Sequence, residues 1–267
     1  DLPPAARLPA PVSFHLTTGS QVQEAAGEIR AEIHLRRGNL TLGLKVGGPL
    51  LSATGAYEWD ADEPVLEEGR AVVFRAGRTD LAAPRSLPLP FQSLPRYNLL
   101  FGRYEPTYDL FLAQNDGRST LNLAGLRLSA VDLAVDAGRL EAVFGENAAD
   151  CRLLRAVLNG GGLALNDLGG IGARAYEITV NSGLASLVFG GWRPGLLLDL
   201  ALTVNGGTLS LRLPPGRQVA VDMTVSAGSV FLNGKRHGRG SRLAAAGSGE
   251  PAGRIRLAVN AGVVKID

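Results

Sequence analysis

The sequence is poor in sulfur and nearly balanced in charge. Its 267 residues include one methionine and one cysteine, Cys151. A single cysteine excludes a disulfide within the chain, and we expect Cys151 to be a packed, unreactive thiol because no nucleophile-activating pattern surrounds it. The 27 basic and 25 acidic residues give a net charge of only +2. No overall field therefore favours binding to nucleic acid or to a membrane surface.

Long apolar runs and catalytic motifs are also missing. No stretch of 18 apolar residues occurs, so the sequence predicts no membrane span. It has no Ser-His-Asp arrangement, phosphate-binding loop or dinucleotide fingerprint. His15, His34 and His237 lack the spacing of metal ligands, although His15 and His34 can face each other if their strands are adjacent. We therefore predict no catalytic residue, no cofactor and no internal metal site.

Glycine and apolar residues dominate what is present. The chain has 35 glycines and 15 prolines, and 45% of its residues are hydrophobic. Glycine permits the positive φ of tight turns and proline removes a backbone donor, so many turns and few long helices are expected. The hydrophobic content is sufficient for a sizeable core. Together these features favour an all-β fold.

A short motif recurs through the second part of the chain. It consists of an apolar residue, a spacer, a second apolar residue, Asn, Asp or Ser, a small residue and glycine, as in LTVNGG at 202–207. A looser copy ends at Gly117, and five successive intervals between final glycines are 21–24 residues, followed by one of 34. Such a period indicates a solenoid, and the Asn-x-Gly step is suited to its corners. The predicted corner glycines are Gly138, Gly161, Gly183, Gly207, Gly228 and Gly262.

Each repeat alternates apolar and polar residues, which is the pattern of a strand with one buried face. Two strands of five or six residues and two turns account for about 22 residues. We therefore predict a β-helix of about six to seven rungs over residues 97–267, with a second corner at segments such as 214–216. An up-and-down meander of hairpins is the alternative, because Asn-Gly is also a strong hairpin signal.

Residues 1–96 do not follow this period. The segment 31–42 has a strand, a glycine corner and a strand, but its neighbours do not repeat at 22 residues. Prolines crowd the segment 83–96, where they prevent regular ladder pairing and favour an extended connector. The sequence thus predicts a small N-terminal β unit with a proline-rich connector over 1–96, and a boundary near residue 97.

A Gly-rich basic insertion, residues 233–253, explains the long interval before Gly262. We expect it to be an exposed loop that can bind an acidic surface, through Lys235, Arg236, His237, Arg239 and Arg242. The rung that follows is predicted to expose an unpaired edge and an apolar layer, formed by Ile255, Leu257, Val259, Val263, Val264 and Ile266. Together the loop and this end rung predict a protein-docking surface.

Four carboxylates suggest a different function. β-Helices can carry glycan-processing sites on one face, where stacked rungs bring two carboxylates together. The candidates are Asp132, Asp136, Asp199 and Asp222. Polar residues are expected in any case on the outward face of an alternating strand, which is the simpler interpretation of all four.

Several of these segments resemble a known family. Residues 31–42 and 53–57, and in the second part 121–128 and 168–192 (LGGIGARAYEITVNSGLASLVFGGW), resemble the bacterial toast-rack proteins, of the LiaF-like and cell-wall-active antibiotics response C-terminal domain type. The resemblance spans roughly residues 12–267 and rests on structural glycines and apolar alternation. It implies a right-handed single-stranded β-helix in a bacterial envelope protein, with no catalytic motif. The LiaF-type regulators have membrane helices before this domain, and their absence here argues against a signalling role.

These observations favour a non-enzymatic, extracytoplasmic scaffold or docking platform. We expect its partners to be other envelope proteins or a second copy of the chain. Because the sequence starts at Asp1 without methionine, we expect export through an N-terminal signal that is removed. The alternatives are a β-helix that binds or processes surface glycan and, less favoured, a copper-dependent redox protein of the envelope.

Overall fold

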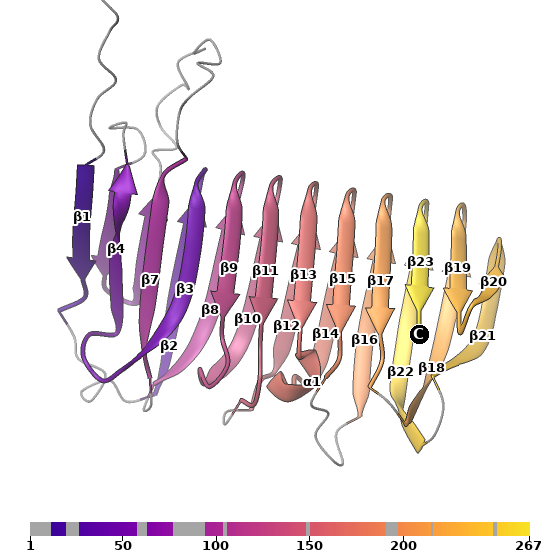
Figure 1. Ribbon diagram of the computed structural model, residues 1–267. Helices are drawn as coiled ribbons and strands as arrows, with labels where there is room; N and C mark the ends of the chain where they lie inside the picture. The colour runs from indigo at the N-terminus through magenta and orange to yellow at the C-terminus, as the bar shows by residue number, and fades with distance from the viewer. Residues whose placement is uncertain are drawn as a thin grey trace, which may run out of the picture.

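The computed structural model describes residues 12–19, 27–57, 63–76, 94–103, 106–147, 150–190, 197–214, 216–247 and 250–267. Almost all of these residues lie in β-strands, which confirms the prediction of an all-β protein. The strands form two large sheets that face each other along an elongated stack (Figure 1). The only helix in this described part, α1 (Leu168–Ile171), has four buried residues, so no helix there can span a membrane.

Both sheets are mixed, with parallel pairing in the middle and antiparallel pairing of the outermost strands. The order of strands in sheet I is β1 (Val12–Thr17), β4 (Leu51–Tyr57), β7 (Arg96–Arg103), β3 (Asn39–Val46), β9 (Arg118–Asn122), β11 (Arg139–Val143), β13 (Gly162–Asn166), β15 (Leu184–Val188), β17 (Thr208–Arg212), β23 (Val263–Ile266), β19 (Ser229–Leu232) and β20 (Lys235–His237). The order in sheet II is β21 (Gly240–Gly247), β18 (Arg217–Val225), β22 (Glu250–Val259), β16 (Leu198–Val204), β14 (Ala175–Val180), β12 (Leu153–Leu158), β10 (Leu128–Val135), β8 (Thr107–Gln114), β2 (Glu28–Leu35), β6 (Ala71–Ala76) and β5 (Pro64–Glu68).

The core lies between the two sheets. Strand β8 illustrates why, because its burial alternates residue by residue: Leu110 and Leu112 are fully buried, whereas Asp109 and Phe111 lie on the outward face and are partly exposed. Side chains on a strand alternate between faces, so one apolar row from each strand fills the space between the sheets. The buried residues form one continuous hydrophobic cluster that runs from Ala31 to Ile266.

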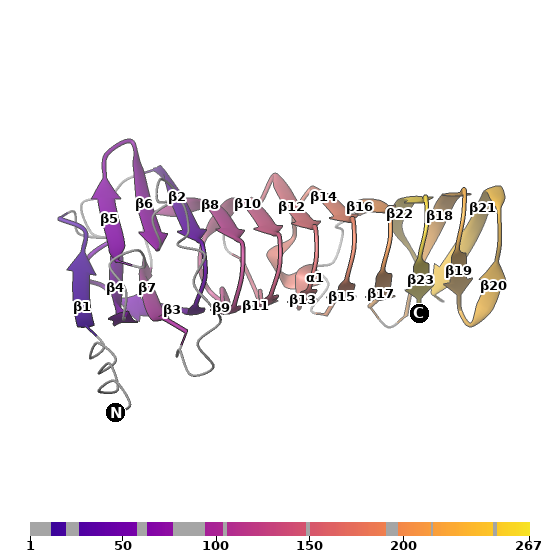
Figure 2. The same cartoon turned by 90° about the horizontal axis from the view of Figure 1, so that it is seen from above.

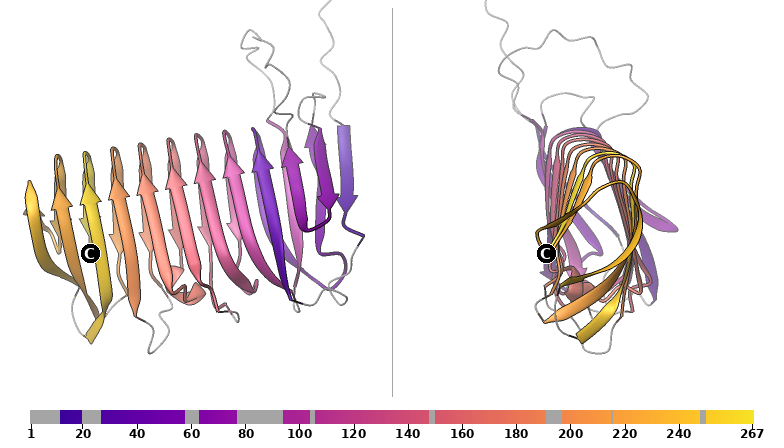
Figure 3. Two further views of the ribbon diagram at one scale, coloured as in Figure 1. Left: turned by 180° about the vertical axis from the view of Figure 1, so that it is seen from behind. Right: turned by 90° about the vertical axis from the view of Figure 1, so that its right-hand side faces the viewer.

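The middle of the stack follows the sequence period. The two-strand units β8–β9, β10–β11, β12–β13, β14–β15 and β16–β17 alternate between the sheets, and each strand pairs in parallel with its counterpart in the next unit. In β12 and β14, for example, Leu158 lies opposite Val180. Viewed along the stack, the successive units overlie one another (Figure 3).

The six predicted corner glycines lie in one column and have positive φ. At Gly161, φ is +79°, and an added Cβ would lie 2.0 Å from the carbonyl oxygen of Gly138 in the preceding unit. The backbones of neighbouring units therefore meet too closely for any side chain. The order of the column at its end is Gly183, Gly207, Gly262 and then Gly228, which differs from the order in the sequence.

The N-terminal strands continue the same two sheets. Strands β2 and β3 pair in parallel with β8 and β9, while β4 to β7 lie farther out, together with β1 (Figure 2). Neither sheet is interrupted near residue 97, where a boundary was predicted, and β7 itself pairs with β3. The predicted connector, residues 83–96, lies largely outside the described residues.

At the C-terminal side, the last strands of the sequence are not the last strands of the stack. Strand β22 pairs in parallel with β16 on one side and β18 on the other, and β23 pairs likewise with β17 and β19. Figure 1 shows this unit, in yellow, inside the orange β18–β19 unit. By inserting here, the unit gains a parallel ladder on both sides instead of one.

The prediction of an exposed end rung is therefore wrong. Five of its six residues are at most 3% exposed and the sixth, Val263, is partly buried; the five are Ile255, Leu257, Val259, Val264 and Ile266. The expected loop at 233–253 also differs, since most of it forms strands. Strand β20 pairs antiparallel with β19, and β21 pairs antiparallel with β18, so this segment covers the end of the stack.

Candidate functional site

The predicted basic residues gather at the covered end of the stack. Lys235 and Arg236 lie in β20 and are exposed, as is Arg239, which precedes β21. The Nε of Arg236 donates a hydrogen bond to the Oγ of Ser229, 3.0 Å away. His237 is partly buried in β20. These side chains therefore stand on an edge strand and on the turn beside it.

Arg242, the fifth predicted residue, lies within β21 opposite Met223 of β18. Residues 233–249 contain four basic residues and no Asp or Glu. The charge of this segment is thus of one sign, although the chain as a whole is almost neutral and Asp222 lies on the neighbouring strand β18. This basic end is the first candidate interaction surface.

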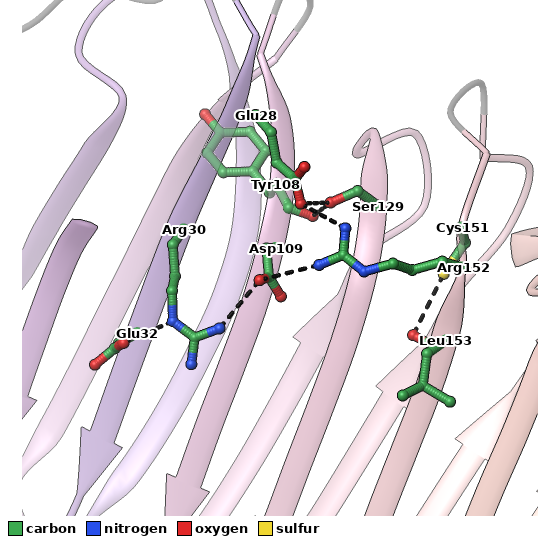
Figure 4. Close-up of polar contacts among 9 residues, drawn as sticks. All are labelled: Glu28, Arg30, Glu32, Tyr108, Asp109, Ser129, Cys151, Arg152 and Leu153. Atoms are coloured by element: carbon green, nitrogen blue, oxygen red, sulfur yellow. Dashed lines mark hydrogen bonds and ion pairs between the residues drawn. The ribbon is translucent and has the colours of Figure 1, made fainter. Parts of the chain in front are cut away.

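A second candidate surface was not predicted from the sequence. It is an ion-pair network on the outward face of sheet II, centred on Asp109 of β8 (Figure 4). The Oδ2 of Asp109 lies 3.0 Å from Nη1 of Arg30 and 3.3 Å from Nη2 of Arg152. Arg30 also contacts Glu32 at 2.7 Å, and Arg152 contacts Glu28 at 2.9 Å. The network links strands β2 and β8 to the start of β12.

Hydrogen bonds within this network stabilise the charged form of its carboxylates. The hydrogen bond from Ser129 Oγ to Glu28 Oε1, 2.7 Å long, and that from Arg152 lower the pKa of Glu28 against the opposing effect of partial burial. The hydrogen bond from Arg30 likewise lowers the pKa of Glu32. Alternating charges of opposite sign in β2, within the run EIRAEIH at 28–34, are the sequence signal that would have predicted this network.

An aromatic side chain lies beside the network. The Cζ of Arg30 is 6.0 Å from the ring centroid of Phe111, and the ring of His34 is 5.4 Å from the same ring. Asp132 of β10 lies opposite Phe111 in the sheet. Burial raises the pKa of Asp132, an effect that Arg155 opposes. The patch thus combines a half-buried aromatic ring with a carboxylate that is partly desolvated.

The other predicted carboxylates do not form a pair. Asp199 Oδ1 lies 2.8 Å from Nη2 of Arg256, and Asp222 Oδ2 lies 2.6 Å from Nη2 of Arg254. Asp199 and Asp222 are on β16 and β18, on either side of β22, and lie opposite Arg254 and Arg256 respectively. Two strand spacings and an offset of two residues separate them by about 12 Å. Each of them is neutralised by an arginine of the inserted strand.

Asp136 belongs to a ladder of side chains along one corner of the stack. The amide nitrogen of Asn159 donates to Asp136 Oδ1 at 2.6 Å. Asn181 donates to Asn159, Asn205 donates to Asn181, and Asn260 donates to Asn205, at 2.6–2.7 Å. The ladder passes from Asn205 directly to Asn260 and so follows the order of the stack.

The histidines and the cysteine have no common site. His15 is on β1 of sheet I and His34 is on β2 of sheet II, so the proposed juxtaposition of the two is wrong. Among the described residues, no group of three or more His, Cys, Asp or Glu side chains can hold a metal ion. Cys151 is fully buried, which raises its pKa to about 12.

Comparisons with known proteins give little guidance. No family model matches the chain, and no curated protein matches it. Among solved structures, a proposed cell adhesion protein from Clostridium sporogenes is 12% identical with a TM-score of 0.45, over 96% of this chain and 99% of the other. A proposed adhesin from Bacteroides fragilis is 9% identical with a TM-score of 0.36, over 97% of each chain. At these values neither likeness carries an argument about function.

Proposed function

We propose that this chain is a non-enzymatic, extracytoplasmic protein of a bacterial envelope that acts as a rigid scaffold and docking platform. In this proposal the two-sheet stack is a right-handed single-stranded β-helix of the toast-rack type. The observation that supports a scaffold role is the continuity of the stack: one hydrophobic cluster extends from Ala31 to Ile266, and both sheets run without interruption from β1 and β5 to β20 and β21.

A stack of units that cannot move relative to one another is suited to hold two partners at a fixed distance. Interior strands are paired on both sides, and the asparagine ladder and the ion pairs of sheet II add contacts between units at two different places on the outer surface. Relative movement of two neighbouring units would break backbone and side-chain hydrogen bonds together. We place the docking function of this scaffold at the basic end, where Lys235 lies on β20 and Arg239 on the turn before β21.

The experiment that tests this proposal uses charge reversal at the basic end. The variant Lys235→Glu/Arg239→Glu changes two exposed side chains, whereas deletion of the whole insertion would remove β20, β21 and the start of β22. A matched control, Arg139→Glu/Arg212→Glu, makes the same charge change at exposed positions in the middle of sheet I.

The immobilised proteins are incubated with solubilised bacterial envelope proteins, and the retained proteins are quantified. Wild type and the control are expected to retain the same proteins, and the end variant is expected to retain several-fold less because rim charges dominate encounter. Equal retention by all three would exclude the basic end as the docking site.

Glycan binding is the second candidate, and the patch around Phe111 favours it. Aromatic rings that lie beside polar groups on a flat surface pack well against sugar rings, and Phe111 has His34 and Arg30 within contact of its ring. A glycan array tests this role. Binding that is lost in Phe111→Ala but kept in the end variant would support it, and an array without signal would exclude it.

A further inference from the structure

The two ends of the stack carry opposite charges on their outermost strands. At the C-terminal side, the segment that contains β20 and β21 has four basic and no acidic residues. At the N-terminal side, the outermost strand of sheet II is β5, with the sequence PVLEE, and Glu63 precedes it. Strand β5 has two acidic residues and no basic one, although Glu67 pairs with Arg75 of the neighbouring strand β6. The outermost strand β5 therefore complements β20 and β21 in charge.

Both sheets end together at each extremity, so among the described residues two edges without a paired strand lie side by side at each end. They belong to β20 and β21 at the basic end and to β1 and β5 at the acidic end. An outermost strand presents unpaired N–H and C=O groups along one side and is a template for another strand. Strand β21 has eight residues, none of them proline, and most are Gly, Ser or Ala.

Apolar side chains on these outermost strands are exposed. Leu243 in β21 is 75% exposed, Val65 in β5 is 45% exposed and Val12 in β1 is 49% exposed. The acidic charges are also held in position: Glu67 forms an ion pair with Arg75 of β6 at 2.5 Å, and Glu68 accepts a hydrogen bond from the backbone nitrogen of Gly19 at 2.6 Å. A strand that docks there would bury apolar surface and gain a backbone ladder.

We infer that the partner at the basic end is a second copy of this chain, docked through its acidic end. Strand β21 of one copy then lies against β5 of the next, and β20 lies near β1, so both sheets continue from copy to copy. Contacts between like ends are disfavoured because they place charges of the same sign together. A head-to-tail contact leaves one free end of each kind, so it extends into an open filament instead of closing as a dimer. This inference rests on the proposed docking function of the basic end and identifies its partner.

Charge reversal at each end tests the inference with purified protein. The basic-end variant is Lys235→Glu/Arg239→Glu, and the acidic-end variant is Glu63→Lys/Glu67→Lys. Sedimentation velocity is measured against concentration at low and high salt. Wild type is expected to associate beyond its monomer mass of 27.9 kDa and to dissociate at about 1 M salt, where the screening length falls to about 3 Å. Each variant alone is expected to need roughly tenfold higher concentration to associate.

The decisive sample is an equimolar mixture of the two variants. The reversed basic end of one variant then meets the reversed acidic end of the other, so the mixture is expected to recover wild-type association. Circular dichroism and urea unfolding of each variant check that the fold is retained. The mid-stack control Arg139→Glu/Arg212→Glu is expected to associate as wild type does.

Three outcomes would overturn the inference: a wild type that stays monomeric up to about 1 mM, a mixture that associates no better than its components, or weakened association in the basic-end variant with wild-type association in the acidic-end variant. The last outcome would indicate a contact between two basic ends. Failure here is distinguishable from failure of the proposed function, because retention of envelope proteins can persist in a chain that does not associate with itself.

Discussion

The middle of the stack and its two ends are built by different rules. From β10 to β17, each unit pairs with the unit that precedes it in the sequence, and one row of glycines and one row of amides mark the shared corner. At both ends the chain leaves this order. Strands β4 to β7 lie outside β2 and β3, and strands β18 to β21 lie outside β22 and β23.

A repeat period therefore determines the shape of a unit but not its position in the stack. A unit of the correct shape can stack on any neighbour that offers the same corner, and neighbours in sequence are neighbours in space only as a tendency. At the C-terminal side the inserted unit has matching side chains: Arg254 and Arg256 of β22 contact carboxylates on the two flanking strands, and Asn260 extends the amide ladder. Ser226, at the same corner of the β18–β19 unit, has no amide group that could extend the ladder.

The largest contrast between middle and end is expected for glycine substitutions. Gly161→Ala places a Cβ 2.0 Å from a backbone oxygen at a positive φ, so we expect a loss of about 4 kcal/mol or more in the free energy of unfolding. Gly240 near the covered end has φ +118° and no atom within 4 Å of an added Cβ, so Gly240→Ala is expected to lose about 1–2 kcal/mol from strain alone. Urea unfolding of both variants measures the difference, and similar losses would mean that the units are not in close contact at the corner.

The second contrast tests the position of the inserted unit. Leu257 of β22 is 3% exposed and Leu243 of β21 is 75% exposed. Leu257→Ala is expected to destabilise by about 2–5 kcal/mol, because it opens a cavity in the core. Leu243→Ala is expected to change stability by less than about 0.5 kcal/mol. If chemical denaturation ranks the two leucines equally, or in reverse, β22 does not lie inside the stack.

A smaller effect tests the neighbours of β22 directly. Arg256 contacts Asp199 only if β22 lies beside β16, and both side chains are more than half exposed. A double-mutant cycle with Asp199→Asn and Arg256→Gln is expected to give a coupling energy of about 0.2–1 kcal/mol. Glu141→Gln in place of Asp199→Asn serves as the control, because Glu141 lies on β11 of the other sheet. Additive effects of Asp199→Asn and Arg256→Gln at low salt would contradict this arrangement.

The smallest effect compares two carboxylates with opposite pKa shifts. Burial raises the pKa of Asp132 above its usual 3.8, so the contribution of this group to stability is fully present below that pH and is lost as the pH rises through the folded pKa. Arg30 lowers the pKa of Glu32 below its usual 4.5, so the contribution of Glu32 is present above that pH and is lost as the pH falls through the folded pKa.

Neutral variants are expected to separate these two cases. At about pH 7, Asp132→Asn is expected to raise the urea midpoint and Glu32→Gln to lower it; at about pH 3 Asp132→Asn is expected to have almost no effect, and the effect of Glu32→Gln is expected to shrink toward zero. Urea titrations at several pH values measure both. A shift of the same sign for both variants at neutral pH would show that burial does not dominate at Asp132.

Much of the fold, but less of the candidate site, can be predicted from the sequence. Alternation and the period near 22 residues correctly predicted strands with one buried face, because both signals are local. The insertion of β22 was missed because two structures explain the long interval before Gly262: an exposed loop, or extra strands that lie outside the following unit. The composition of the interval does not distinguish them. The string of small residues in Ser241–Gly247 suggested a loop, but pairing with β18 makes it a strand.

The ion pairs were harder to predict for a related reason. Asp199 and Asp222 were considered as a catalytic pair because stacked units bring equivalent positions together. Their strands are separated by β22, whose arginines come from 32 and 57 residues away along the chain. A contact of this kind depends on strand order. Only Glu28 to His34, where opposite charges alternate within one strand, carried a local signal for the network.

The amide dipoles of the asparagine ladder are aligned in one direction along the stack. An ionised carboxylate accepts hydrogen bonds but donates none, so Asp136 fixes the orientation of Asn159, which in turn fixes every amide as far as Asn260. Four side-chain dipoles therefore point the same way along the corner. If an amide replaced the carboxylate of Asp136, all four asparagine side chains could flip together and reverse the direction of their hydrogen bonds. A single residue thus sets the direction of the whole ladder.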